Sequence, residues 1–290
     1  MIFDGKQAAI QAKQDIAARV RKLTDTYQRR PCLQVILVGT DYGSIRYAES
    51  CIKQCTSVGM ECRWIRLDEQ SSQEQVLQVI EQANNDNTVD GILIQMPLPH
   101  HLHTDTIVQH LSPLKDVDGV TDQNAASLFK QRHNDYSAFC VPCTPRSVMR
   151  ILHNAHIDLD GKRAIVVGRS NIVGLPVSKL LMNENCTVTV AHSHTRNLPQ
   201  LLQQADIIVA AIGQPRFITA DMIGEGSVVI DVGINSDPDT GKMCGDVDFE
   251  AAEPKCTLIT PVPGGVGPLT ICSLMENTLD CYERKLIIEN

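Results

Sequence analysis

The sequence lacks clusters of basic residues, long apolar runs and a second CxxC pair. Its formal net charge is −8 over 290 residues, and its Lys and Arg are scattered. A nucleic-acid-binding surface needs clustered positive charge, so we expect no nucleic-acid partner. No stretch approaches the roughly 18 apolar residues of a membrane span, and no early apolar run follows a basic stretch. We therefore expect no signal peptide, no membrane segment and a cytoplasmic location.

Cysteine is plentiful, but its number and spacing do not describe a disulfide framework. There are 11 cysteines, an odd number, spread along the whole chain. At this length reduced, cytosolic thiols are the default. Cys140-Val-Pro-Cys143 is a CxxC pair, yet no second CxxC or His pair supplies the other ligands of a zinc site. We expect no bound metal.

Short apolar, β-branched runs alternate with helix-like segments from end to end. A helical period fills residues 71–84, for example, between two such runs. Strands that are buried on both faces and separated by helices indicate a mostly parallel sheet. The expected strands form an early and a later series: 33–39, 62–67 and 90–99, then 163–168, 187–193, 205–213, 227–233 and 257–261.

Two such series predict two α/β domains joined by a loop-like stretch at 116–145. We assign residues 1–140 to an N-terminal domain and residues 141–268 to a second domain of the Rossmann type. A last helix begins near residue 269, after a stretch rich in Gly and Pro. From the residues alone, this helix fits against either domain.

RAIVVGRSNIVGLPVSKLL (163–181) is typical of a strand, a glycine turn and a helix. Gly168 ends the strand, and Gly174 lies where the helix begins. Backbone N–H groups and the dipole at such a helix start favour a phosphate. Ser170 stands where a GxGxxG motif has its second glycine, so the pattern also fits a plain strand-to-helix turn.

The next strand favours NADP over NAD. An NAD site usually ends this strand with an acid that holds the ribose 2′-OH. Here it ends Ala191-His192-Ser193-His194-Thr195, without an acid, and Arg169 lies in the turn. An arginine with nearby hydroxyls suits a 2′-phosphate. The two histidines also fit a solvated loop.

The chain resembles the bifunctional methylenetetrahydrofolate dehydrogenase/methenyltetrahydrofolate cyclohydrolase family over essentially its whole length. Eight motifs occur in family order, and TPVPGGVGPLT and GRSNIVGLP are the most specific of them. The eight motifs are QMPLP (95–99), KDVDG (115–119), PCTP (142–145), GRSNIVGLP (168–176), HSHTRNL (192–198), DVGIN (231–235), GDVDF (245–249) and TPVPGGVGPLT (260–270).

The resemblance implies an N-terminal domain and a Rossmann NAD(P)-binding domain with tetrahydrofolate derivatives bound in the cleft between them. It also implies that the C-terminal helix, 269–290, returns to the N-terminal domain. It implies a homodimer that oxidises 5,10-methylenetetrahydrofolate with NADP and hydrolyses the methenyl product to 10-formyltetrahydrofolate. The implied cofactor-binding residues are Gly168, Arg169, Ser170, Ile172, Val173, Gly174, His192, Ser193 and Ile234. The implied folate-binding residues are Tyr47, Gln95, Pro97, Asp118, Pro263, Gly264 and Gly265.

Physical chemistry gives several of these positions a reason. A carboxylate at Asp118 matches the N–H donors of a pterin, although the same residue also fits a turn or a helix cap. Asp116 is expected to be structural. Glycines at 264 and 265 let the backbone approach a flat ligand closely, where side chains would block it. A plain connection between elements is the alternative for that stretch.

GSIRYAESCIKQC (43–55) predicts a helix with Tyr47 and Cys51 one turn apart on one face. By themselves these residues fit half of an active site, an ordinary core contact or a site that has lost a group. The family pattern Ser-x-x-Tyr-x-x-x-Lys places its catalytic lysine at Cys51. Lys53 is rotated by roughly 200° and should face solvent.

The two family reactions depend on that lysine differently. Hydride transfer moves no proton, whereas water addition and ring opening need a general base. We therefore expect Tyr47, Gln95 and Asp118 to serve an NADP-dependent dehydrogenase, and Cys51 to leave cyclohydrolase activity weak or absent. The alternatives are a fully bifunctional enzyme and a catalytically silent folate- or NADP-binding paralogue.

Overall fold

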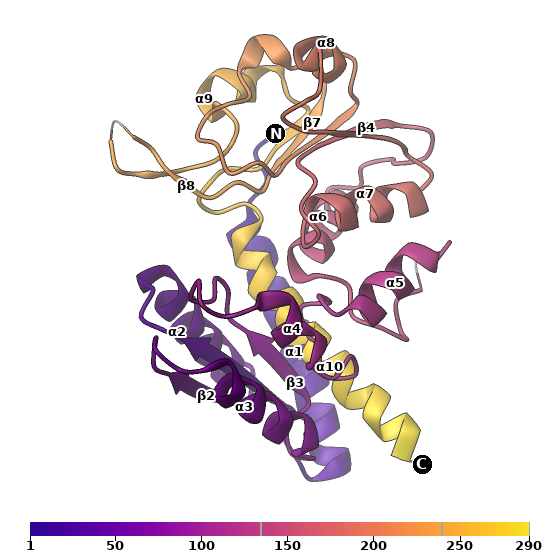
Figure 1. The fold of residues 1–290 in the computed structure, drawn as a ribbon. Helices are drawn as coiled ribbons and strands as arrows, with labels where there is room; N and C mark the ends of the chain where they lie inside the picture. The colour runs from indigo at the N-terminus through magenta and orange to yellow at the C-terminus, as the bar shows by residue number, and fades with distance from the viewer. Residues whose placement is uncertain (134, 239, 290) are drawn as a thin grey trace. The chain divides into compact units, whose positions relative to one another are not determined.

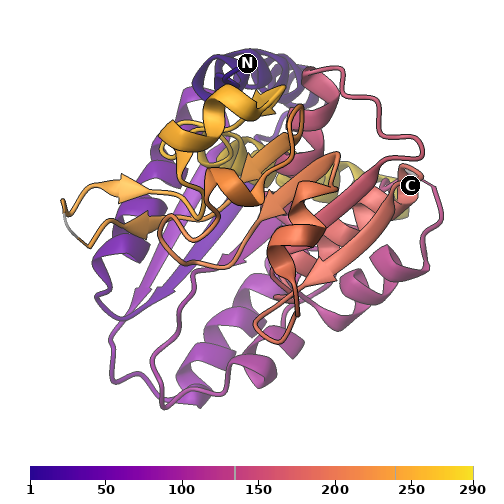
Figure 2. The same ribbon diagram turned by 90° about the horizontal axis from the view of Figure 1, so that it is seen from above.

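The computed structural model describes residues 1–133, 135–238 and 240–289 (Figures 1 and 2). The chain divides into two compact units. Unit 1 consists of Met1–Ile10, Phe129–Asp135 and Thr144–Thr270, and unit 2 of Gln11–Leu128, Tyr136–Cys143 and Ile271–Asn290. Both units are α/β, as the alternating pattern predicts.

Unit 2 is built on a three-stranded parallel sheet in the order β2-β1-β3. Its strands are β1 (Cys32–Val38), β2 (Glu61–Leu67) and β3 (Gly91–Ile94). All seven residues of β1 are buried, as a central strand covered on both faces requires. The helices that lie wholly or mostly in this unit are α1 (Gly5–Tyr27), α2 (Tyr42–Ser57), α3 (Gln73–Asn85), α4 (Thr104–Gln109), α5 (Asp122–Lys130) and α10 (Gly267–Glu289).

Helix α3 shows how local sequence sets these elements. Ser72 and Gln75 form a capping box that satisfies N–H groups at the helix start. The buried side chains of α3 are Val76, Ile80 and Ala83, spaced at three and four residues, so they share one face. That face joins side chains of β1, β3 and α4 in one apolar core.

Unit 1 is built on a five-stranded parallel sheet in the order β10-β7-β6-β4-β5, and Figure 2 shows its strands side by side. The strands are β4 (Arg163–Val167), β5 (Thr187–Ala191), β6 (Ile207–Ala210), β7 (Val228–Asp231) and β10 (Leu258–Ile259). The helices are α6 (Cys143–Asn154), α7 (Gly174–Asn183), α8 (Leu198–Gln203), α9 (Phe249–Ala252), and the 3₁₀ turns η1 (Ala220–Met222) and η2 (Glu253–Lys255). A short antiparallel hairpin, β8 (Asn235–Ser236) and β9 (Met243–Cys244), extends from the sheet (Figure 1).

The strand order places a topological switch point at β4. The chain runs from β4 to β5 on one side and then crosses to β6 on the other side of β4. Ligands of open α/β sheets bind outside the carboxyl ends of strands at such a point. The turn after β4 is therefore the first place to look for a nucleotide site.

Several elements differ from the sequence prediction, and most strands are shorter than the apolar runs that located them. β3 ends at Ile94 instead of residue 99, because Pro97 and Pro99 follow and proline has no N–H to donate to the ladder. The stretch 116–145, predicted as loop-like, contains helix α5. The last helix begins at Gly267, two residues earlier than predicted.

Candidate functional site

The turn after β4 brings backbone groups together more closely than side chains would allow. Gly168 has a φ of +126°, a conformation that favours glycine. A Cβ at Gly168 would lie 2.1 Å from the carbonyl oxygen of Ala211, which follows β6. A Cβ at Gly174, the first residue of α7, would lie 2.2 Å from the carbonyl oxygen of Gly168. The two glycines thus keep side chains out of the switch point.

Ser170 caps this turn. Its hydroxyl oxygen accepts hydrogen bonds from the N–H groups of Val173 and Gly174, at 3.2 and 3.3 Å. The hydroxyl thereby satisfies two donors at the start of α7. The GxGxxG comparison, which placed Ser170 at a glycine position, did not predict this role. Ile172 lies beside it, 50% exposed.

The ends of β4 and β5 offer a cation and a hydroxyl at the same edge of the sheet. Val167 and Ala191 are partners in adjoining parallel strands, so Arg169 and Ser193 each lie two residues beyond a matched pair. Both side chains are exposed, and His192, which directly follows Ala191, is half-buried. Residues 192–195 contain no acid. This edge suits a phosphate better than a free 2′-OH.

Two buried carboxylates shape the neighbouring loops, and the sequence analysis did not single them out. Asp231 is 3% exposed and Asp246 is fully buried. Burial raises the pKa of Asp231 to about 7, against three backbone N–H groups that lower it. Asp246 accepts hydrogen bonds from the N–H groups of residues 212–214 and from the side-chain amide of Asn235. The loop so fixed presents Ile234, which is 66% exposed.

The signal for these carboxylates was present in the sequence. Asp231 ends a buried strand in DVGIN, and Asp246 follows a glycine in GDVDF. A buried acid at a strand end must find donors, and the loop N–H groups at the same sheet edge are the nearest ones. Asp231 and Asp246 thus hold in place the loops that follow β6 and β7, next to the candidate nucleotide site.

In unit 2 the start of α2 and the end of β3 meet at one carbonyl. Asp41 caps α2 by accepting from the N–H of Ser44, which lowers the pKa of Asp41. The Ser44 hydroxyl donates to the carbonyl oxygen of Met96 at 3.2 Å, and the side-chain amide of Gln95 donates to the same oxygen at 2.9 Å. Gln95 is thereby held beside the first turn of α2. Pro97 follows, exposed.

Tyr47 and Cys51 share one face of α2, as their spacing predicts. The Tyr47 hydroxyl and the Cys51 thiol are hydrogen-bonded. Burial raises the pKa of Tyr47 well above its ordinary value, and that of Cys51 to about 12. The Cys51 side chain is fully buried, whereas Lys53 is exposed, as predicted. At neutral pH Cys51 is therefore an uncharged thiol.

Asp118 completes the group of polar side chains next to Tyr47. It is half-buried and accepts hydrogen bonds from the backbone N–H and the thiol of Cys143. Burial raises its pKa to about 6, Cys143 opposes this rise, and nearby Asp116 adds to it. Asp116 is structural, as predicted, because it is fully buried and bonds to residues 120, 121 and 124.

The glycines after Pro263 pack against the protein's own backbone in unit 1. Gly264 has a φ of +112°. A Cβ at Gly5 would lie 1.9 Å from the carbonyl oxygen of Gly265, and one at Gly265 would lie 2.7 Å from the carbonyl oxygen of Pro261. The packing of the protein's own backbone is therefore enough to require glycine at these positions, whether or not a ligand binds there. Pro263 itself is exposed. Folate binding by this stretch stays a prediction.

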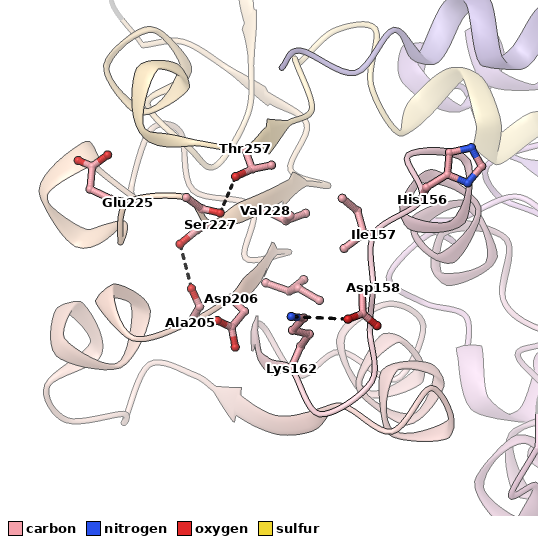
Figure 3. A pocket seen from close by; sticks show the side chains of 12 residues that line it. His156, Ile157, Asp158, Lys162, Ala205, Asp206, Glu225, Ser227, Val228 and Thr257 are labelled. Carbon is pink, nitrogen blue, oxygen red and sulfur yellow. Dashed lines mark hydrogen bonds and ion pairs between the residues drawn. The ribbon is translucent and has the colours of Figure 1, made fainter.

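A cavity of about 290 Å³ lies at the opposite edge of the unit 1 sheet (Figure 3). Its lining includes Lys162, Asp206 and Ser227, which come directly before β4, β6 and β7. Lys162 pairs with Asp158 at 3.7 Å across its wall. Because ligands of such sheets bind at the carboxyl ends, we do not assign the nucleotide to this cavity.

Metal and membrane signals are absent from the described part of the chain. No three His, Cys, Asp or Glu side chains among the described residues are arranged to hold a metal ion. None of the helices in residues 1–133, 135–238 and 240–289 has the length and apolar character that crossing a bilayer requires.

Two family models match the chain. Residues 3–118 match the catalytic domain of tetrahydrofolate dehydrogenase/cyclohydrolase, and residues 142–286 match its NAD(P)-binding domain. The chain is 47% identical to the bifunctional protein FolD of Campylobacter curvus, over 96% of this chain and 94% of that protein. It is 46% identical to the bifunctional protein FolD of a Sulfurihydrogenibium species, over 99% of each.

Solved structures show the same fold. The bifunctional enzyme FolD of Campylobacter jejuni has a TM-score of 0.94 and 39% identity, with 98% of this chain and 99% of that chain covered. FolD of Trypanosoma brucei, solved with NADP and an inhibitor, has a TM-score of 0.94 and 34% identity, with 99% and 98% covered. The second structure shows that a relative of this fold takes NADP.

Proposed function

Because the chain belongs to the tetrahydrofolate dehydrogenase/cyclohydrolase family, we propose that it oxidises 5,10-methylenetetrahydrofolate with NADP and has weak or absent cyclohydrolase activity. The observation that carries the second half is the uncharged, buried thiol of Cys51 at the position of the family lysine. The first half rests on the family and on the turn after β4.

The glycine turn of unit 1 fits the cofactor. Gly168 and Gly174 leave the backbone bare at the switch point, where a pyrophosphate binds in such sheets. Arg169 and Ser193 would hold the 2′-phosphate through a charge-assisted bond and a hydroxyl. Bound NADP supplies a hydride acceptor.

The polar group in unit 2 suits the folate. Asp118, with a pKa of about 6, is largely ionised at neutral pH and would accept hydrogen bonds from pterin N–H groups. Tyr47 would lie against the ring system, and the Gln95 amide is fixed by Met96. Loss of hydride leaves a cation stabilised by its two flanking nitrogens, so these residues orient the substrate and need move no proton.

The cyclohydrolase step asks for more than orientation. Adding water and opening the ring require proton transfers, and a positioned base commonly contributes about 10²–10⁴-fold. With a pKa of about 12, Cys51 is too rarely a thiolate at neutral pH to act as that base. Lys53 is exposed on another face of α2. The step therefore lacks its usual proton acceptor.

The names of the relatives favour a second candidate, a fully bifunctional enzyme. In that case another group or a chain of waters accepts the proton, and Asp118 is the ionisable carboxylate nearest to Tyr47. Cyclohydrolase rates would then be of ordinary size, and their pH profile would be the same in Cys51→Ala.

Replacing Cys51 with Lys tests the proposal. Asp118 and Tyr47 surround this position, so a lysine there would find an anionic partner. We expect hydrolysis of methenyltetrahydrofolate, followed by its absorbance, to rise at least about tenfold, within the range of general-base effects. Cys51→Met, which fills the space without a base, and Lys53→Ala should leave the rate unchanged. An unchanged rate in a folded Cys51→Lys protein would contradict the proposal.

Location, assembly and domain division are further proposals based on the family. We propose a cytoplasmic homodimer, with domains at residues 1–140 plus 269–290 and at 141–268. Sedimentation equilibrium tests the dimer, and a monomer at micromolar concentration would contradict it.

A further inference from the structure

The CxxC pair is divided in the structure, because its two thiols have different partners. The Cys143 thiol lies 3.2 Å from the carbonyl oxygen of Val117 and contacts Asp118. The Cys140 thiol instead lies 3.5 Å from the thiol of Cys281, 141 residues further along the chain. Cys140 therefore has a thiol partner that its local sequence does not reveal.

A guanidinium group lies against both sulfur atoms. Nη2 of Arg284 is 2.8 Å from the sulfur of Cys140 and 3.1 Å from that of Cys281. Cys281 and Arg284 are on α10, and Cys140 is in the segment 136–143, so all three belong to unit 2. The two cysteines are only 1% and 2% exposed. The two buried thiols and the guanidinium group are therefore in mutual contact.

The surroundings divide the two thiols into a nucleophile and a proton donor. The hydrogen bond with Cys281 and the charge of Arg284 lower the pKa of Cys140, although burial opposes them. The same hydrogen bond, together with burial, raises the pKa of Cys281 well above its ordinary value. A thiolate next to a cation is the reactive form of cysteine.

We propose that Cys140 and Cys281 form a reversible disulfide when the protein meets a peroxide. The pair is thus a modification site, and the inference does not depend on the proposed catalytic function. In a reducing compartment, which the proposed cytoplasmic location implies, disulfides are usually transient and redox-sensing, so the pair is expected to be reduced at rest.

The chemistry balances with a hydroperoxide as oxidant. The Cys140 thiolate attacks one peroxide oxygen, the O–O bond breaks, and Cys140 becomes a sulfenic acid with release of hydroxide. The Cys281 sulfur then attacks the Cys140 sulfur and displaces the hydroxyl group, which leaves as water with the Cys281 proton. Two electrons pass from the thiols to the peroxide, and a dithiol reductant restores both thiols by exchange.

The sulfur atoms of Cys140 and Cys281 need to move only a short distance to form the bond. A disulfide has an S–S bond of about 2.05 Å, so the sulfur atoms must approach by roughly 1.5 Å from 3.5 Å. Cys55 and Cys62 are a competing pair, because they are also hydrogen-bonded to each other. Burial keeps Cys51 and Cys256 in the thiol form, with pKa values of about 12 and about 11.

The experiment uses the reduced, full-length protein. It is treated with hydrogen peroxide, quenched, denatured and alkylated, and its disulfide-linked peptides are identified by mass spectrometry over time. We expect the Cys140–Cys281 peptide to be the first linked product and to disappear with dithiothreitol. A Cys55–Cys62 link that forms first, or oxidation of Cys140 to sulfinic acid without the link, would overturn the proposal.

Matched variants test each part of the site. In Cys281→Ser, a sulfenic acid should accumulate on Cys140 and be trapped by dimedone. Arg284→Gln should slow formation of the link at least about threefold, because it removes the charge that favours the thiolate. Arg21→Gln, the same change at an exposed position, and Cys256→Ser should not alter the rate. Equal rates in Arg284→Gln and wild type would contradict the role of the cation.

Discussion

At residue scale, the proposed function depends on Cys51, which we assign to the position of the family lysine. Its side chain is fully buried on the face of α2 that carries Tyr47, and Asp118 is close enough to raise its pKa further. Burial, the main cause of the raised pKa of Cys51, would disfavour an ammonium group at this position, whereas the negative charge of Asp118 would favour one. The proposed assignment of this position to the family lysine therefore relies on Asp118 as the partner of the ammonium group.

Asp118→Asn should weaken folate binding without lowering the stability of the protein. It removes the charge that would accept pterin N–H bonds, so the KM for the folate should rise about 10–100-fold, as for one lost hydrogen bond to a charged group. Burial disfavours the ionised form, so the melting temperature should not fall. Steady-state kinetics and thermal unfolding measure the two effects. A KM equal to wild type would contradict the assigned role.

The raised pKa of Asp118 also sets a pH dependence. Because the folded-state pKa of about 6 lies above the ordinary Asp value of about 4, the folded protein holds this proton more tightly than the unfolded chain. The resulting stabilisation is complete below about pH 4 and is lost as pH rises through about 6. The KM of wild type should rise below pH 6, and that of Asp118→Asn should not.

Local spacing predicts some of these residues and not others. The four-residue spacing of Tyr47 and Cys51 is enough to place them on one helix face. Asp116 is structural, as expected from KDVDG, whereas folate binding by Asp118 stays a prediction. The pairing of Cys140 with Cys281 joins residues 141 apart, and only tertiary packing determines it. The Ser170 cap depends on the turn geometry, which the missing second glycine did not specify.

At element scale, the strand–turn–helix unit of β4 and α7 depends on backbone contacts. Gly168 is in contact with the end of β6, and Gly174 with Gly168 itself. The geometry that exposes the helix start to a phosphate is thus maintained by the absence of two side chains.

Gly168→Ala should damage this unit, whereas Gly161→Ala should not. Both glycines have positive φ, +126° and +70°, but a Cβ at Gly161 would meet nothing within 4 Å. Gly161→Ala should cost about 1 kcal/mol of conformational strain. Gly168→Ala must also displace Ala211, so NADP affinity measured by calorimetry should fall at least about tenfold. Equal affinities in the two variants would show that close approach is unimportant.

The hydrophobic pattern of the sequence predicts some secondary-structure elements better than others. Apolar, β-branched runs located every strand of both parallel sheets. The central strands β1, β6 and β7 are buried along their whole length, whereas the edge strands β2 and β5 are only partly buried. The run at 90–99 was too long, since its second half contains two prolines that cannot donate to a ladder. Helix α5 has only nine residues and two buried side chains, too weak a period to stand out within 116–145.

At the scale of the whole molecule, α10 fastens distant segments of unit 2. The buried side-chain amide of Asn277 donates to the carbonyl oxygens of Val117 and Val141, at 2.7 and 2.8 Å. Arg19 on α1 pairs with Asp280 and Glu283 on the same helix. The segments that hold Asp118 and Cys143 therefore depend on the last helix. The general α/β class was predictable from alternation, but these cross-links were not.

Asn277→Ala should destabilise the protein clearly. The substitution removes the side-chain amide that donates to two buried carbonyl oxygens, at a position with no exposed surface. The free energy of unfolding should fall by about 2–4 kcal/mol. The melting temperature should fall by roughly 5–10 °C. Asn87→Ala, at an exposed position, should change it by less than about 1 °C. A similar small change for Asn277→Ala would contradict the fastening role of α10.

Assaying both reactions on one preparation of the wild-type protein, with NADP and with NAD, tests the proposed function most directly. We expect robust oxidation of 5,10-methylenetetrahydrofolate, faster with NADP, and hydrolysis of methenyltetrahydrofolate at or near the uncatalysed rate. Hydrolysis as fast as the oxidation would contradict the role assigned to Cys51. Binding of both ligands without any oxidation would indicate the catalytically silent paralogue instead.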